Sequence, residues 1–161
     1  MTQSTSTVRS PWNKGKLVGQ KAPLRVRDVW AIRTRLQLQE RVRDLALFNL
    51  GIDSKLRGCD LARARLGSDD FLFPSRLRDS DHLGTRQYAR VVRGWVGEVG
   101  LDPTLYGTHP MRRTKATLIY RRTKNLRAVQ LLLGHTKLES TVRYLGIEVS
   151  DALEISEQTE V

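Results

Sequence analysis

The last third of the chain, from Gly107 to Leu145, constrains the fold most, because it predicts three consecutive short helices. His109 and Arg112 stand three residues apart and are expected on one face of the first helix. The second helix is predicted over Asn125 to Leu133, where leucine and valine recur at helical spacing. Gly134 then follows at the position where a glycine commonly ends a helix. A helical region with tight turns is therefore expected here.

The third helix of this region carries a tyrosine, Tyr144, near its end. Thr136 and Glu139 have the T-x-x-E spacing of a capping box, which predicts where this helix begins. At about 100° per residue its apolar positions share one side and are expected to be buried: Leu138, Val142 and Leu145. Tyr144 points away from that side, which predicts an accessible phenol on a polar face. The alternative is a tyrosine that packs in the core or at its rim.

Three motifs in this region occur in a fixed order. They are H-x-x-R at His109 and Arg112, G-H-T around His135, and Tyr144 nine residues after that histidine. H-x-x-R alone occurs by chance in many proteins, but the ordered set resembles the C-terminal signature of the tyrosine recombinases, the phage-integrase group. The resemblance covers roughly Asp28 to Ile147. It implies a mainly α fold, a helical core like the catalytic domain of these DNA breaking-rejoining enzymes, with a reduced β element.

The resemblance also implies a set of site residues. The segment GIDSKLRGCDLARARL matches the first arginine box of the family, which makes Arg57 a donor to the scissile phosphate. Tyr144 would be the nucleophile, Arg57 and Arg112 would hold the phosphate, and His109 and His135 would transfer protons or donate hydrogen bonds. This chemistry needs neither a metal nor a cofactor. Taken alone, Arg57 also fits a surface ion pair, and each histidine also fits an ordinary helix-end or turn residue.

The chain departs from the family pattern between Arg57 and His109. Only about fifty residues separate them, roughly half of what the family would place there. No lysine occurs between Lys55 and Lys115, although the family carries a catalytic lysine on a β-hairpin in this region. The chain is expected to be shortened between about residues 62 and 71, so the group that would protonate the 5′-hydroxyl leaving group is missing.

The charge of the chain favours a polyanionic partner. Lysine and arginine total 28 against 17 acidic residues, which gives a net charge of +11, and double-stranded DNA is the expected partner. The single cysteine, Cys59, excludes an internal disulfide framework. No apolar run approaches 18 residues and no signal peptide is evident, so we expect a cytoplasmic protein without a membrane partner.

Two regions are expected: a basic flexible arm over residues 1–27 and an integrase-like catalytic domain over residues 28–161. Asp28 is expected to cap the first helix of the domain, and a second helix should end at Gly51. Thr85 is expected to cap a helix whose apolar stripe lies in the core. In the C-terminal tail, Leu153 and Ile155 are candidate contacts within a homo-oligomer, with packing on the same chain as the equal alternative.

Three functions remain open from the sequence. The first is site-specific DNA recombination or integration through tyrosine-mediated strand breakage and rejoining. The second is a catalytically impaired relative, decayed or regulatory, that binds DNA without completing strand exchange. The third is a basic helical protein with structural or RNA-binding duties, for which no aromatic-interleaved or glycine-clamp pattern of an RNA-binding module is visible.

Overall fold

The computed structural model describes residues 21–54, 56–76 and 80–147. The described residues form seven helices: α1 (Val26–Leu38), α2 (Val42–Asp53), α3 (Gly58–Ala62), α4 (Thr85–Glu98), α5 (Thr108–Thr123), α6 (Leu126–Leu133) and α7 (Leu138–Leu145). Their only β pairing is two isolated antiparallel bridges, between Arg65 and Phe71 and between Pro74 and His82. The predicted mainly α architecture, with a small β element near Phe71, is confirmed.

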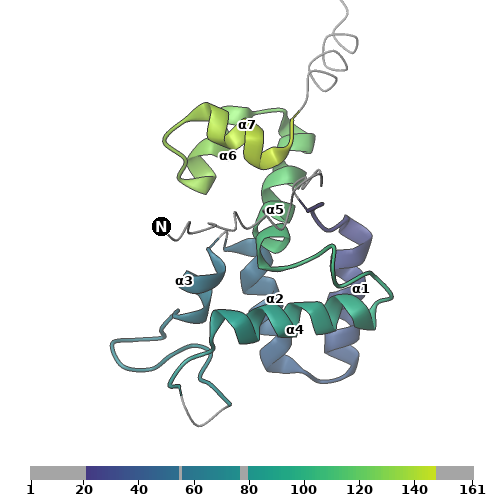
Figure 1. Cartoon of the computed structure of the whole chain (residues 1–161), viewed down its shortest axis with the longest axis vertical. Helices are drawn as coiled ribbons and strands as arrows, with labels where there is room; N and C mark the ends of the chain where they lie inside the picture. Colours follow the sequence, from purple (N-terminus) through teal and green to yellow (C-terminus); the bar gives the residue numbers. More distant parts are fainter. Residues whose placement is uncertain (1–20, 55, 77–79, 148–161) are drawn as a thin grey trace, which may run out of the picture.

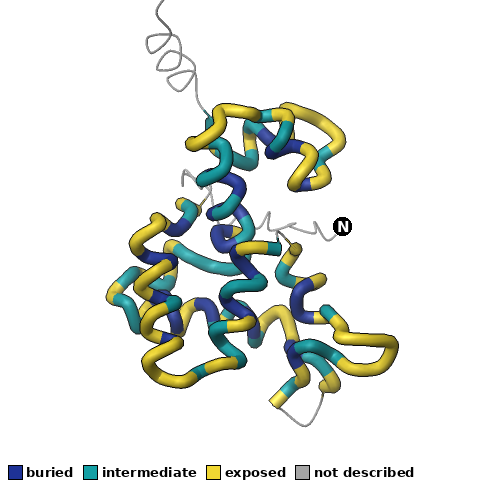
Figure 2. Tube along the Cα trace, turned by 180° about the vertical axis from the view of Figure 1, so that it is seen from behind, coloured by how far each residue is buried: buried dark blue, intermediate teal, exposed yellow. Residues whose placement is uncertain are grey.

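The helices form two packed groups that share α5 (Figure 1). Helices α1 to α4 lie around the first half of α5 and enclose the larger apolar cluster, which includes Leu36, Phe48 and Trp95. Helices α6 and α7 pack on each other and on the second half of α5, around a smaller cluster of Ala116, Val129 and Leu133. Figure 2 shows buried segments following α5 through both groups.

The predicted apolar stripe of α4 is confirmed. Tyr88, Val92 and Trp95 are each 1% exposed and lie one helical turn apart. The Trp95 ring meets Phe48 of α2 edge to face, with centroids 5.6 Å apart. The N-cap of α4 is Gly84 rather than the predicted Thr85, which is the first helical residue.

The start of α1 differs in detail from the prediction. Arg25 is the N-cap, and Asp28 occupies the third helical position rather than capping the helix. The Asp28 carboxylate accepts a hydrogen bond from the Arg25 backbone N–H at 3.1 Å, so it caps the first turn from inside the helix.

The predicted end of α2 at Gly51 is wrong, because the helix continues to Asp53. Gly51 is buried, and a Cβ atom there would lie 2.5 Å from the Tyr88 hydroxyl and 2.9 Å from the Met111 methyl. The glycine therefore permits close packing of α2 against α4 and α5 instead of ending a helix.

The apolar residues at the end of α1 and the start of α2 are exposed. Leu38 and Val42 are 80% and 75% exposed, while Leu47 and Phe48 are buried. The chain turns between α1 and α2 at Glu40, which has a positive φ of 53°. Leu38 and Val42 flank this turn at the outer end of both helices, where neither can reach the core.

The segment from residue 63 to residue 84 connects α3 to α4 without a helix or a named strand among its described residues, which omit 77–79. It still packs on the core, because Phe73 and Leu83 are buried and the Leu83 N–H donates to the Phe73 carbonyl at 2.9 Å. His82 stacks on Phe71 with centroids 4.9 Å apart. His82 is therefore a loop histidine that packs on an aromatic ring.

Residues 21–25 pack against α5. Leu24 is 3% exposed, and its N–H donates to the Thr114 hydroxyl at 3.0 Å. The packed body therefore begins before Asp28, whereas residues 1–20 of the expected arm lie outside the described residues. The expected oligomer contacts Leu153 and Ile155 also lie outside them. No helix in the described part of the chain is long and apolar enough to cross a membrane.

Candidate functional site

The first two turns of α5 carry one side of the site. Gly107 is the extended N-cap, and Pro110 and Met111 turn into the core. His109 and Arg112, on the opposite side of the helix, are exposed and half-buried respectively. The predicted sharing of one helix face by these two residues is confirmed.

Arg57 reaches the same place from α3, as the extended N-cap residue of that helix. The next residue, Gly58, lies against α5: a Cβ atom there would be 3.3 Å from the Thr108 Cβ atom. The absence of a side chain at Gly58 therefore brings the start of α3 close to the start of α5. This approach places the exposed Arg57 side chain beside His109.

The turn between α6 and α7 supplies a second histidine. Asn125 caps α6 by accepting a hydrogen bond from the Ala128 N–H at 2.9 Å, and Gly134 ends it with a positive φ of 69°, as the sequence predicts. The His135 N–H donates to the Gln130 carbonyl, and the Gln130 amide returns a bond to the His135 carbonyl, at 3.1 and 3.0 Å. The His135 backbone is therefore fixed from both sides.

The predicted capping box of α7 does not form. The helix begins at Leu138 with Lys137 as its N-cap, and no side chain caps it. Thr141 instead takes the buried position, with no exposed surface, and its hydroxyl lies 3.1 Å from Nδ1 of His135. A polar residue can face inward here because this hydrogen bond satisfies it.

Tyr144 lies one turn after Thr141 and shares its inward face, so the predicted accessible phenol is wrong. Its hydroxyl is buried, whereas Leu138, expected in the core, is 43% exposed. The Tyr144 ring meets the His135 ring edge to face at 5.3 Å, and the Arg112 guanidinium lies 5.8 Å from its centroid. These contacts, rather than the apolar stripe, set the orientation of α7.

The five site residues expected from the sequence line one cavity of about 430 Å³. They come from three separate parts of the chain: Arg57, His109, Arg112, His135 and Tyr144. Gly58, Cys59, Thr85, Tyr88 and Thr108 complete its lining. The structure thus brings the whole expected set together.

Burial and the charges around this cavity have opposite effects on the pKa of Tyr144. Burial raises the pKa of the Tyr144 phenol above its ordinary value, while the positive charges of Arg112 and Arg113 act to lower it. Burial also lowers the pKa of His135, and the nearby guanidinium groups of Arg112 and Arg57 lower it further. At neutral pH the site therefore holds a protonated phenol and a neutral His135 imidazole.

A second cavity of about 250 Å³ adjoins Tyr144 and His109 and is lined in addition by Lys21, Pro110 and Arg113. Sequence reasoning missed Lys21 and Arg113. Arg113 follows Arg112 directly in the sequence, but Arg112 is half-buried and Arg113 is buried. Only the orientation of each residue on the helix relative to the core could have indicated this difference. Lys21 gave no signal, since it lies far from the other residues in sequence.

Neither cavity is lined by a carboxylate among the described residues. Across the same part of the chain, no group of three or more His, Cys, Asp or Glu side chains could hold a metal ion. Arg112 is also tied to the protein, because its guanidinium donates to the Leu133 carbonyl at 3.0 Å. The arrangement suits an anion that is held by cationic and neutral donors.

A helical body with a tyrosine among arginines and histidines has the features of a phosphate-directed transfer site. The family model described as "Phage integrase family" matches residues 56–150, more than half of the chain. The chain therefore belongs to the phage integrase family.

The relatives agree with this assignment. The chain is 35% identical over 83 residues to the tyrosine recombinase XerD of Brucella suis, a match that covers 50% of this chain and 26% of XerD. It spans about a quarter of the length of such curated relatives.

Solved structures show the same fold. The crystal structure of XerA recombinase superposes with a TM-score of 0.70 at 17% identity, over 94% of this chain and 68% of that one. A structure of the XerH site-specific recombinase bound to a palindromic difH substrate, in a post-cleavage complex, gives 0.65 at 14% identity, over 85% and 53%. The expected helical core of a tyrosine recombinase is thereby confirmed.

Proposed function

We propose that this protein carries out site-specific DNA recombination or integration by breaking and rejoining DNA strands through Tyr144. The observation that carries the proposal is the single cavity in which Tyr144 meets two arginines and two histidines from three separate segments. Membership of the phage integrase family supports the same reaction.

In the proposed step the Tyr144 oxygen attacks the phosphorus of the scissile phosphodiester. A bond from phosphorus to the tyrosine oxygen forms as the bond to the 5′-oxygen breaks, so the strand becomes a 3′-phosphotyrosyl ester. The phenolic proton passes to a base, for which His109 is the exposed candidate, and the released 5′-oxygen takes up a proton. Rejoining is the reverse reaction with the 5′-hydroxyl of another strand.

The cationic groups would act on the phosphate. Arg57 and Arg112 would hold its non-bridging oxygens and stabilise the charge that develops in the transition state. In the tautomer whose Nδ1 accepts from the Thr141 hydroxyl, the neutral His135 ring would carry its proton on Nε2 and donate it to the phosphate. The first N–H groups of α5 also favour an anion at this end of the helix.

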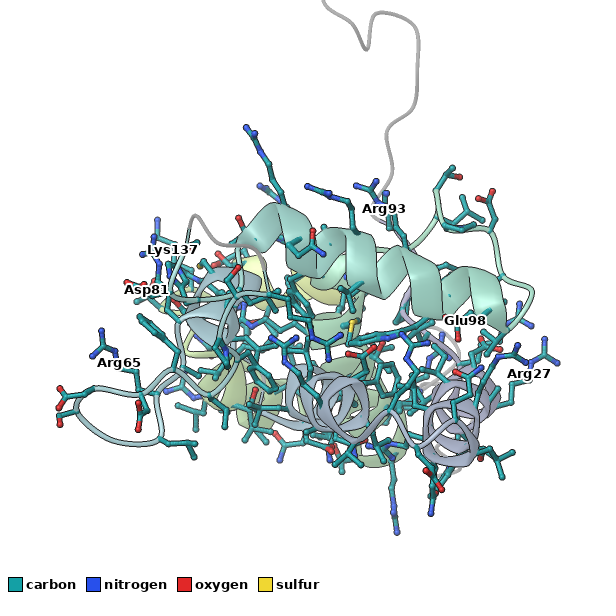
Figure 3. The ribbon with its side chains drawn as sticks, turned by 90° about the horizontal axis from the view of Figure 1, so that it is seen from below. Arg27, Arg65, Asp81, Arg93, Glu98 and Lys137 are labelled. Carbon is teal, nitrogen blue, oxygen red and sulfur yellow. The ribbon has the colours of Figure 1, made fainter. Side chains whose placement is uncertain are left out.

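Double-stranded DNA is the proposed substrate. Besides the net charge of +11, α4 carries Arg86, Arg90 and Arg93 as an exposed row that starts beside the cavity at Thr85. Figure 3 shows Arg93 projecting from the outer face of this helix. We propose that the row follows the DNA backbone, and that a homo-oligomer forms on DNA through residues 148–161.

We propose slow turnover. No lysine lies between Lys55 and Lys115 in the sequence, and the guanidinium groups of the cavity scarcely give up a proton. Loss of a general acid costs on the order of 10² to 10⁴ in rate. A covalent intermediate that accumulates slowly is therefore expected, rather than rapid strand exchange.

Covalent trapping tests the proposal. The full chain is incubated with fragmented genomic DNA of the organism that carries the gene, the mixture is denatured, and DNA linked to protein is sequenced. Tyr144→Phe should abolish the adduct. Tyr120→Phe is the matched control, since Tyr120 packs against the same small cluster but lines neither cavity.

An adduct that depends on Tyr144 and maps to a common sequence would identify the nucleophile and the target site together. Salt-sensitive DNA binding without any adduct would overturn the proposed catalysis and indicate the impaired, DNA-binding relative instead.

A further inference from the structure

Arg113 is a buried cation that the reaction described above does not use. It is 7% exposed, although it follows the half-buried Arg112 in α5. Burying a guanidinium is costly unless polar groups surround it. Its Nη2 atom donates to the backbone carbonyl of Lys21, which ties residues 21–24 to the helix.

Arg113 and Tyr144 line the same second cavity, which Arg57 does not line. The charged and titratable groups that line the two cavities with Tyr144 come from several elements: Arg112, Arg113 and His109 on α5, His135 in the α6–α7 turn, Arg57 before α3, Lys21 in the N-terminal segment, Cys59 of α3 and Tyr88 of α4. None of them is a carboxylate, so the phenol faces cationic and neutral groups among the described residues.

We propose that Arg113 is a positioning residue for Tyr144, which anchors residues 21–24 behind the phenol and supplies a fixed positive charge there. This role rests on the proposed function only in that it treats Tyr144 as the nucleophile. In the proposed function Arg57 and Arg112 hold the phosphate, whereas Arg113 acts on the tyrosine oxygen from the protein side, together with the charge of Arg112.

The charge balance of the first step explains what Arg113 contributes. As the phenolic proton leaves for a base, negative charge grows on the tyrosine oxygen until the bond to phosphorus forms. A nearby guanidinium stabilises that oxyanion without giving or taking a proton, because it stays protonated throughout. The positive charge of Arg113 acts to lower the pKa of Tyr144, against the larger effect of burial, in agreement with this role.

The test measures the ionisation of residue 144 in the full chain without DNA. A fluorotyrosine is incorporated at position 144, since ring fluorination lowers the phenol pKa into a range where the protein stays folded. Its ¹⁹F shift is followed against pH in the parent and in Arg113→Gln. We expect the midpoint to move upward in Arg113→Gln and to stay near the parent value in Arg113→Lys, which keeps the charge.

Two controls separate charge from structure. Thr114→Val removes the acceptor of the Leu24 N–H and so loosens the same N-terminal segment without changing a charge. Arg121→Gln removes an exposed charge from the far end of α5. Neither variant should move the midpoint. An unchanged midpoint in Arg113→Gln, or an equal shift in Thr114→Val, would overturn the proposal.

Arg113→Met serves as a second neutral variant if Arg113→Gln does not fold by circular dichroism. Loss of folding in both would show that Arg113 acts through the fold alone, which also overturns the proposal. Because this titration needs no DNA, it can succeed even if covalent trapping fails. Once a target site is known, Arg113→Gln should slow adduct formation at pH 7 by about tenfold and leave DNA binding intact.

Discussion

At the scale of the residue, the burial of the Tyr144 hydroxyl bears on the proposed catalysis. A phenol whose pKa is raised by burial holds its proton firmly at neutral pH. In the proposed reaction the nucleophile would therefore form only when the phosphate has arrived and a base takes the proton. This arrangement would protect the tyrosine from reaction in the absence of DNA and would slow the first step.

The pH dependence of stability should report on His135. Its native pKa is lowered from the ordinary 6.5, chiefly by burial, so below about pH 6.5 the unfolded chain binds the proton more readily than the native protein. The free energy of unfolding should therefore fall as the pH drops from 7 toward 5. We expect His135→Asn to reduce this slope in urea titrations, with parallel curves above pH 7.5. An unaltered slope would contradict the lowered pKa.

The absence of lysine between Lys55 and Lys115 leads to a prediction about the leaving group in the proposed reaction. A DNA strand with sulfur in place of the 5′-bridging oxygen at the cleavage site needs no proton donor, since a thiolate leaves unaided. We expect the adduct to form faster from this substrate, by on the order of 10²-fold, in single-turnover assays. Equal rates on both substrates would mean that another group donates the proton. Lys21, which lines the second cavity, would be the first to test.

At the scale of the element, regular periodicity was enough to find most helices, but not their exact packing. The stripe of α4 and the glycine end of α6 follow from local sequence, and the structure has both. The buried face of α7 could not be predicted from its apolar residues. The hydrogen bond between His135 and Thr141 allows a polar residue to be buried, which turns a different side of the helix inward. The end of α2 at Gly51 was predicted wrongly for a related reason. This glycine allows close packing against Tyr88, which is distant in sequence, and does not end the helix.

Two glycine-to-alanine substitutions should have opposite effects. Gly51→Ala places a methyl group against the Tyr88 hydroxyl and should destabilise the protein by about 1–3 kcal/mol. Gly94→Ala, in the exposed middle of α4 with open space around it, should stabilise by about 0.5–1 kcal/mol. Urea unfolding measures both. A neutral Gly51→Ala would show that α2 and α4 can separate at little expense.

The arginine row of α4 should contribute to DNA affinity without adding sequence preference. Each phosphate contact adds about 0.9 to the slope of log affinity against log salt concentration. If each of the three arginines contacts one phosphate, replacing Arg86, Arg90 and Arg93 by glutamine should lower the magnitude of that slope by about 2.7. Fluorescence anisotropy at several salt concentrations measures it. The control replaces Arg27 and Arg35 of α1, which line neither cavity, and should leave it nearly unchanged. The reverse result would place the DNA on α1.

At the scale of the whole molecule, the candidate site joins the two packed groups. Arg57 precedes α3, which packs in the larger group, Tyr144 packs on the smaller cluster and meets the His135 ring, and α5 connects the two groups. Through its ordered motifs and the arginine box, the sequence predicted five of the ten residues that line the first cavity. It could not predict the second cavity, because Lys21 and Arg113 meet only through the packing of the N-terminal segment on α5.

The two groups should differ in local stability. The smaller cluster contains three buried apolar residues, so opening α6 and α7 exposes little apolar surface. We expect the amides of α6 and α7 to exchange with solvent faster than those of α2 and α4, as measured by mass spectrometry under native conditions. Equal protection in both groups would mean that the domain opens only as a single cooperative unit.

The short connection between α3 and α4 has a practical consequence for protein engineering. Its turn at residues 67–69 is exposed and is closed by hydrogen bonds on either side, from the Leu66 N–H to Asp70 at 3.0 Å and from the Leu72 N–H to Ala64 at 2.8 Å. A hairpin grafted into this turn would leave both bonds and the buried Phe73 in place. A hairpin that carries a lysine could therefore be inserted at this turn without changing the rest of the domain. The contribution of a lysine to the rate could then be measured by adding the residue rather than by removing it.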